Sequence, residues 1–162
     1  MPTPAPDRYS AITALPFGPM GVVCDGLALR ELVFLPPETR ERAPVNPLAA
    51  QAVAALQAWI ADPDRPHGLP LLLQGTQFQR RVWAAIAAIP CGRTRRYGEL
   101  ARELGSAARA VGGACGANPF PLIVPCHRVV SSQGLGGFAG NTDGHLMQVK
   151  QWLLSHEARL SR

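Results

Sequence analysis

The chain contains few cysteines, and none of them belongs to a CxxC pair: they are Cys24, Cys91, Cys115 and Cys126. This spacing argues against a disulfide framework and against a structural zinc site. No apolar run is long enough to span a bilayer, and the proline-rich residues 1–7 lack the charged and apolar regions of a leader peptide. We therefore expect a cytoplasmic protein in which a free thiol persists, with no metal and no cofactor.

Lysine is nearly absent. Lys150 is the only lysine among the 16 lysine and arginine residues, and the net charge is +5. Arginine makes paired contacts with phosphate and stacks on bases better than lysine does. Genomic base composition produces the same bias, so the composition permits an anionic partner without requiring one. A chain of 162 residues has room for one domain, or for a small lobe and a compact domain.

Residues 1–73 are predicted to form a small α/β lobe with a short antiparallel sheet. Strands are expected at 21–24 and 27–35, joined by Asp25-Gly26, because glycine accepts the positive φ of a tight turn. Asn46 and Pro47 are expected to begin a helix that stops at Asp62. We predict a structural role for this lobe, which contains no recognisable catalytic or binding motif.

Residues 74–162 are predicted to form a mainly helical domain, which makes the whole chain an α+β protein. Thr76 and Gln79 have the spacing of a capping box. Helices are expected at 97–104 and 106–117, with Ser106 as the cap of the second, a pattern typical of a helix-turn-helix. The second helix carries Arg109 among small residues, so it is either a recognition helix in a DNA groove or a helix packed tightly on its neighbours.

The most informative motif sets a thiol beside an imidazole, in Pro125-Cys126-His127-Arg128-Val129. The thiolate is the attacking species, and an imidazole that takes the thiol proton supplies thiolate near neutral pH. The pair by itself has two interpretations: a nucleophile with its base, or a buried cysteine beside a histidine by chance.

The last predicted helix, at 144–160, continues its apolar stripe with a carboxylate. Leu146, Val149 and Leu153 form the stripe, and Glu157 is the next position on the same face. A carboxylate there is costly unless it reaches water or has a partner. Either Glu157 is solvated near the helix end, or it meets His127 in a series of carboxylate, imidazole and thiol.

Several short motifs occur in order along residues 74–162. They are Gly-Thr-Gln-Phe-Gln-Arg-Arg-Val-Trp from Gly75, Tyr97-Gly98-Glu99-Leu100-Ala101, Arg109-Ala110-Val111-Gly112-Gly113-Ala114, Asn118-Pro119, Pro125-Cys126-His127-Arg128-Val129 and Leu153-Leu154-Ser155-His156-Glu157. Together, and in this order, they resemble the O6-alkylguanine-DNA alkyltransferases, also called methylated-DNA-protein-cysteine methyltransferases. The similarity covers about residues 75–160.

The resemblance implies direct repair of DNA, by irreversible transfer of an alkyl group from O6 of guanine to Cys126, once per molecule. It makes His127 the base, acting through a water, and Glu157 the carboxylate that orients the imidazole. Tyr97 would donate a proton or hydrogen bond to the departing guanine, and Asn118 would brace the turn near the thiol.

The resemblance also implies base flipping from double-stranded DNA, with Arg109 entering the duplex in place of the extruded nucleotide. The other expected DNA contacts are Arg96, Ala107, Gly112 and Gly113, and the expected pocket residues are Tyr97, Val129, Phe138 and Ala139. Cys115 is assigned to packing alone. The protein is expected to act as a monomer, singly or in clusters along DNA.

Three other functions compete with this one. A relative that only recognises alkylated bases would lack the cysteine, so Cys126 argues against it. A cysteine hydrolase would have no use for Arg109 on a helix of small residues. A transcriptional helix-turn-helix module would need a dimer interface and base-reading polar side chains, which are not evident.

Overall fold

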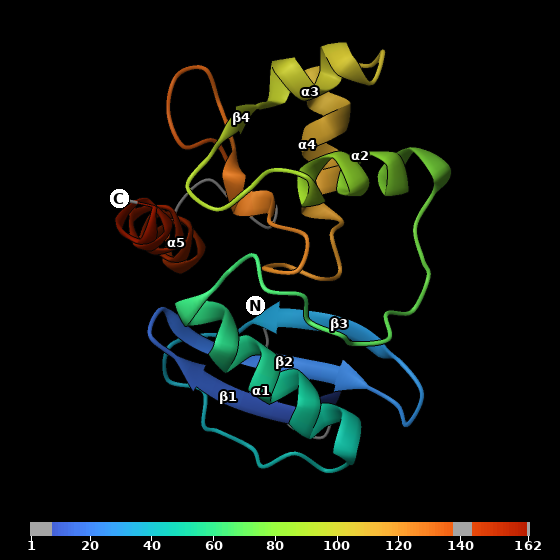
Figure 1. Ribbon diagram of the computed structural model, residues 1–162, viewed down its shortest axis with the longest axis vertical. Coiled ribbons are helices and arrows are strands. Elements are labelled where there is room, and N and C mark those ends of the chain that lie inside the picture. The colour runs from blue at the N-terminus through green and yellow to red at the C-terminus, as the bar shows by residue number, and fades with distance from the viewer. Residues whose placement is uncertain (1–7, 138–143, 162) are drawn as a thin grey trace. The chain divides into compact units, whose positions relative to one another are not determined.

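The computed structural model describes residues 8–137 and 144–161 (Figure 1). The chain divides into two compact units, Met1–Leu73 and Gln74–Arg162. The first unit contains a three-stranded antiparallel sheet and one helix, and the second is mainly helical. The predicted α+β class is therefore confirmed. Among the described helices, none combines the length and apolar character that crossing a membrane requires.

The sheet of the first unit has the strand order β1-β2-β3, with β1 at Ala11–Leu15, β2 at Gly18–Cys24 and β3 at Leu29–Phe34. Helix α1, Pro47–Ala61, packs against all three strands (Figure 1). Its start is as predicted, because the Asn46 side chain accepts a hydrogen bond from the Ala49 amide at 2.8 Å.

Two expectations for this sheet were wrong. Strand β1 was not predicted, because its five residues follow a proline-rich start and alternate only weakly in polarity. The turn after β2 does not depend on a left-handed glycine, because the φ of Gly26 is not positive. Instead, Asp25 Oδ1 accepts hydrogen bonds from the amides of Leu27 and Ala28, so the turn is longer and β3 begins at Leu29.

The second unit begins with helix α2, Gln77–Ala87, which has the predicted capping box. The Thr76 hydroxyl accepts from the Gln79 amide at 3.0 Å, and the Gln79 side chain accepts from the Thr76 amide at 2.9 Å. Trp83 on α2 donates its indole N–H to the Ala114 carbonyl at 2.8 Å. This bond fixes α2 to the helix that carries Ala114.

Helices α3, Tyr97–Glu103, and α4, Ala108–Gly116, form the predicted helix-turn-helix pair. Gly105 ends α3 in the left-handed region at φ 66°, and the Ser106 amide donates to the Ala101 carbonyl at 2.8 Å. Ser106 therefore completes the end of α3. The prediction that Ser106 caps α4 is wrong. The N-cap of α4 is Ala107, which has no side-chain capping bond.

A small parallel pairing links the start of α3 to the Cys-His motif. Strand β4, Arg95–Arg96, pairs with β5, Val129–Val130. The 3-10 turn η2, Cys126–Arg128, comes directly before β5, and α3 comes directly after β4. The pairing therefore places residues from the start of α3 near Cys126. The last helix, α5, spans His145–Leu160 and contacts η2.

Candidate active site

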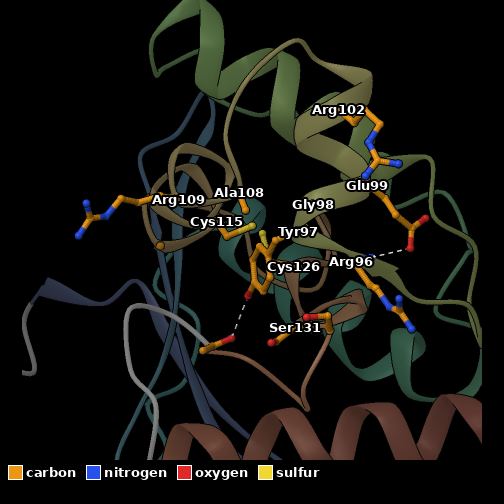
Figure 2. Close-up of a pocket in the computed structure, with 14 residues that line it drawn as sticks. Arg96, Tyr97, Gly98, Glu99, Arg102, Ala108, Arg109, Cys115, Cys126 and Ser131 are labelled. Atoms are coloured by element: carbon orange, nitrogen blue, oxygen red, sulfur yellow. Dashed lines mark hydrogen bonds between the residues drawn. The ribbon is translucent and has the colours of Figure 1, made fainter.

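Cys126 lies at one side of a cavity of about 680 Å³ in the second unit (Figure 2). Only 6% of the residue is exposed, and it belongs to the apolar core that α2, α3 and α4 build. Helix α4 contributes three small residues to the cavity, together with one thiol and one arginine. The lining residues are Arg96, Tyr97, Gly98, Glu99, Arg102, Ala108, Arg109, Gly112, Cys115, Gly116, Cys126, Ser131, Ser132 and Gly137.

Asn118 holds the turn on which Cys126 sits. Its side-chain amide donates to the Val124 carbonyl at 2.9 Å and to Cys126 Sγ at 3.2 Å. Its side-chain oxygen accepts from the Phe120 amide at 2.9 Å. Asn118 therefore braces the backbone and also places a hydrogen-bond donor on the sulfur of Cys126.

A second thiol contacts the first, because the side chains of Cys115 and Cys126 are hydrogen-bonded to one another. Figure 2 shows the two sulfurs side by side at the cavity. The hydrogen bond lowers the pKa of Cys115 and, together with burial, raises the pKa of Cys126. The two groups therefore titrate as a pair that gives up one proton before the other.

His127, Arg128 and Glu157 form a buried cluster next to this thiol pair. His127 Nε2 lies 2.7 Å from Glu157 Oε1, and Arg128 Nε lies 3.1 and 3.0 Å from the two carboxylate oxygens. Arg128 Nη2 also donates to Glu157 Oε2, and Nη1 donates to the Ile89 carbonyl at 2.6 Å. All three residues are at most 2% exposed. Glu157 is thus paired and not solvated, as the second of the two sequence interpretations expected.

The pKa shifts in this cluster fix the roles of the imidazole nitrogens. Burial favours the neutral form of Glu157, but hydrogen bonds from His127 and Arg128 outweigh it and hold the pKa of Glu157 at about 2. An ionised carboxylate only accepts hydrogen bonds, so Nε2 of His127 must be the donor. Burial also lowers the pKa of His127, so the imidazole is neutral near pH 7, with its basic lone pair on Nδ1.

Tyr97 lines the cavity, and the fully buried Lys150 lies against it. The Tyr97 hydroxyl donates to the Gly137 carbonyl at 3.3 Å, and Lys150 Nζ donates to the carbonyls of Val129 and Gly137, each at 2.8 Å. Lys150 Nζ also lies 5.9 Å from the Tyr97 ring centroid. Burial raises the pKa of Tyr97, which therefore stays protonated, and lowers the pKa of Lys150 to about 8.

The residues that were predicted to contact DNA are divided between the cavity rim and the surface beside it. Arg96, Arg109 and Gly112 line the cavity, and Figure 2 shows the Arg109 side chain directed away from Cys126. Ala107 and Gly113 are exposed but are not among the described lining residues. Val129 is fully buried in the core. Phe138 and Ala139 lie outside the described residues.

Two buried cations had no predicted role, and Cys115 was predicted to serve packing alone. Lys150 was recognised only as the one lysine, and Arg128 only as part of the motif. Helical spacing was a usable signal for Cys115, because Ala108, Gly112 and Cys115 lie four and three residues apart and all line the cavity. No comparable local signal existed for Lys150, whose partners come from distant parts of the chain.

Comparison with known proteins extends these observations. The family described as 6-O-methylguanine DNA methyltransferase, DNA binding domain, matches residues 77–159. The methylated-DNA-protein-cysteine methyltransferase of Salmonella typhimurium is 55% identical over 89 residues, which are 53% of this chain and 49% of that protein. The chain therefore spans about half the length of that relative. The protein of the same name from Methanosarcina mazei is 36% identical over 157 residues, 92% of this chain and 96% of that one.

Solved structures are similar over nearly the whole chain. The crystal structure of Mycobacterium tuberculosis OGT in complex with DNA has a TM-score of 0.74 and 37% sequence identity, and the match covers 92% of each chain. The O6-methylguanine methyltransferase of the same organism has the same TM-score and identity, with 93% of each chain covered.

Proposed function

The chain belongs to the family of 6-O-methylguanine DNA methyltransferases, as its motifs predicted, and from this premise we propose that it repairs alkylated DNA by direct reversal. The alkyl group passes from O6 of guanine to Cys126, and the thioether that forms is not hydrolysed. Each molecule therefore acts once. The protein works as a monomer in the cytoplasm, on double-stranded DNA. The observation that supports this most directly is a thiol at a cavity, backed by a buried imidazole and carboxylate.

His127 and Glu157 supply the proton transfer that the reaction needs. Displacement at a saturated carbon requires thiolate. The neighbouring Cys115 thiol and burial raise the pKa of Cys126, so little thiolate is present at neutral pH. The neutral imidazole of His127 removes the proton through a water. Glu157, 2.7 Å from Nε2, then stabilises the imidazolium that results. Arg128 keeps Glu157 ionised and fixed in position.

Tyr97, which lines the same cavity as Cys126, assists the leaving group. Guanine leaves as an anion unless a proton or hydrogen bond reaches its ring. Because the pKa of Tyr97 is raised, its hydroxyl remains a donor throughout the working pH range. The hydroxyl donates to the Gly137 carbonyl in the free protein, and it turns to the base when the cavity is filled.

Helix α4 and Arg109 allow the damaged base to reach the cavity. A base inside a duplex cannot contact a protein thiol, so the nucleotide is rotated outward at a cost of a few kcal/mol. The small residues of α4 let the helix approach the minor groove closely, and Arg109 fills the gap that the nucleotide leaves. Such binding follows DNA shape and backbone, which suits repair at any sequence.

The first test is transfer of a methyl group from a duplex that contains O6-methylguanine. Mass analysis of the digested protein should find one added methyl group, on the peptide that contains Cys126, and unmodified guanine in the DNA. The yield should stop at one methyl group per protein molecule however much DNA is supplied. Continued turnover would contradict a single-use mechanism, and a methyl group on another peptide would contradict the assignment of Cys126.

Arg109→Ala should slow repair of duplex DNA by about tenfold, if Arg109 offsets part of a flipping cost of a few kcal/mol. Reaction with the free base O6-benzylguanine needs no flipping, so its rate should stay within about twofold. The measurement is the single-turnover rate on each substrate. Arg159→Ala, which removes an exposed charge near the end of α5, is the matched control and should change neither rate. Equal losses of rate on the duplex and on the free base would contradict the proposed role of Arg109 in flipping.

A further inference from the structure

Two thiols meet at the cavity, and the alkyl-transfer scheme above uses only that of Cys126. Cys115 lies near the end of α4, is half-buried, and packs against the apolar core that contains Cys126. Both residues line the cavity, and Figure 2 shows their sulfurs side by side. Both cysteines are free thiols in the structure. Two adjacent free thiols can join as a disulfide and separate again on reduction.

Asn118 bonds to both cysteines and holds their backbones near one another. Its backbone amide donates to the Cys115 carbonyl at 3.2 Å, and its side-chain amide donates to Cys126 Sγ at 3.2 Å. The residue before Cys115 is also fixed, because the Ala114 carbonyl accepts from the Trp83 indole at 2.8 Å. A disulfide forms without backbone movement only between cysteines whose backbones lie close together. The bonds of Asn118 support that requirement for this pair.

The two thiols differ in acidity and in exposure. The neighbouring Cys126 thiol and, after it, the cation of Lys150 lower the pKa of Cys115, whereas Cys115 and burial raise the pKa of Cys126. Cys115 is half-buried, and Cys126 is only 6% exposed. An oxidant that enters the cavity therefore meets Cys115 as the more reactive thiol. An accessible cysteine of low pKa beside a second cysteine is the usual arrangement of thiols that oxidise reversibly.

We propose that Cys115 and Cys126 form a site of reversible oxidation, at which hydrogen peroxide converts the two thiols into a disulfide. The Cys115 thiolate attacks one peroxide oxygen and the O–O bond breaks, which gives a sulfenic acid and hydroxide. His127 takes the proton of Cys126, whose sulfur then attacks the sulfur of Cys115. The S–O bond breaks, and the hydroxide that leaves is protonated. Each sulfur gives up one electron, the peroxide takes up two, and two waters form.

The consequence for repair rests on the proposed function. Oxidation of Cys126 to a sulfinic or sulfonic acid would destroy the acceptor, because thiols do not reduce those acids. A disulfide blocks alkyl transfer only while it lasts, since a thiol reductant returns both sulfurs to the reduced state. Once Cys126 carries an alkyl group its sulfur has no proton to lose, so the disulfide forms only in molecules that have not yet acted.

Mass analysis after peroxide treatment tests the site directly. Trypsin cuts after Arg109 and Arg128, so one peptide, residues 110–128, contains both thiols. Peroxide-treated protein is labelled with iodoacetamide and digested, with and without prior dithiothreitol. Cys115→Ser and Cys115→Ala both lack the second thiol, and the pair covers the case in which one variant folds poorly. Cys91→Ser is the matched control, because it removes another half-buried thiol, whose pKa burial raises to about 11.

In the unchanged protein and in Cys91→Ser, the peptide should lose two hydrogen atoms and take up no label, and dithiothreitol should reverse both changes. Methyl transfer should fall at least about tenfold and return after reduction. At the same dose the Cys115 variants should keep most of their own transfer, because the buried Cys126 has no low-pKa neighbour to react first. A peptide that stays fully labelled in the unchanged protein would overturn the proposal, as would Cys115 variants that lose and regain transfer to the same extent.

The two measurements separate failure of this site from failure of the proposed function. Mass analysis detects the disulfide whether or not the protein transfers alkyl groups. A disulfide in a protein that takes no methyl group from O6-methylguanine would contradict the proposed function and support the oxidation site. Methyl transfer to Cys126 in a protein that forms no disulfide would overturn the oxidation site alone.

Discussion

Cys126→Ser should abolish alkyl transfer from an O6-methylguanine duplex while leaving affinity for that duplex within about twofold. A hydroxyl is far less acidic than a thiol and its oxygen is a poor nucleophile at saturated carbon, so general-base help from His127 does not restore the transfer. The DNA-contacting residues that we propose lie on α4 and at the cavity rim, whereas Cys126 is only 6% exposed. The two measurements are methyl incorporation by mass and duplex affinity by titration at fixed salt.

Cys24→Ser is the matched control for this substitution. Cys24 lies in the first unit, where its thiol donates to Asn46 Oδ1 at 3.6 Å, outside the machinery of the reaction. This variant should transfer the methyl group at the rate of the unchanged protein. Methylation of the Cys126→Ser variant at an undiminished rate would show that another thiol is the acceptor, and Cys115 would be the first to examine.

Glu157→Gln should lower the free energy of unfolding by about 3 kcal/mol, since removing one partner of a buried ion pair strands the other charge. The stranded charge is that of Arg128, which is 2% exposed. Alkyl transfer should also slow by at least about tenfold, because an amide cannot stabilise the imidazolium of His127 as a carboxylate does. Chemical denaturation and single-turnover rates give the two quantities.

The pH dependence of that stability loss follows from the pKa of Glu157, which is about 2 in the folded protein and ordinarily 4.5. A depressed carboxyl pKa stabilises the fold above the unfolded value, and the contribution disappears as the pH falls through the folded value. The difference in unfolding free energy between the unchanged protein and the variant should therefore be constant above pH 4.5. It should shrink between about pH 4.5 and about pH 2.

Glu103→Gln provides the same chemical change at an exposed ion pair. Glu103 Oε2 lies 2.6 Å from Arg95 Nη1, and both side chains contact solvent. Exposed pairs contribute about 1 kcal/mol or less, so this variant should lose little stability. Comparable losses at both positions would mean that burial of the cluster around Glu157 has no special energetic weight.

Local chemistry accounts for most of what the sequence predicted correctly. Asn46 as a helix cap and Thr76 with Gln79 as a capping box involve partners within three residues of one another. Glu157 was found by helical periodicity, because a carboxylate on an apolar stripe requires a partner. In each case the physical requirement is visible within one or two turns of helix.

The expectations that failed depended on competition between neighbouring elements. Ser106 has the composition of an N-cap, but its amide completes the end of α3, because Gly105 adopts the left-handed conformation. The roles of Arg128 and Lys150 were invisible because their partners lie far away in sequence. Ile89 is 39 residues from Arg128, and Val129 is 21 residues from Lys150. Only the folded chain brings these groups together.

The hydrogen bond from the Trp83 indole to the Ala114 carbonyl makes Trp83 an intrinsic fluorescence probe of helix α4. Ala114 directly precedes Cys115 on α4, so any displacement of that segment alters the polarity around the indole ring. Of the other tryptophans, Trp59 lies in the first unit and Trp152 stacks on His156 in α5. Ultraviolet emission from Trp83 can therefore follow occupancy of the cavity in real time, without an attached dye.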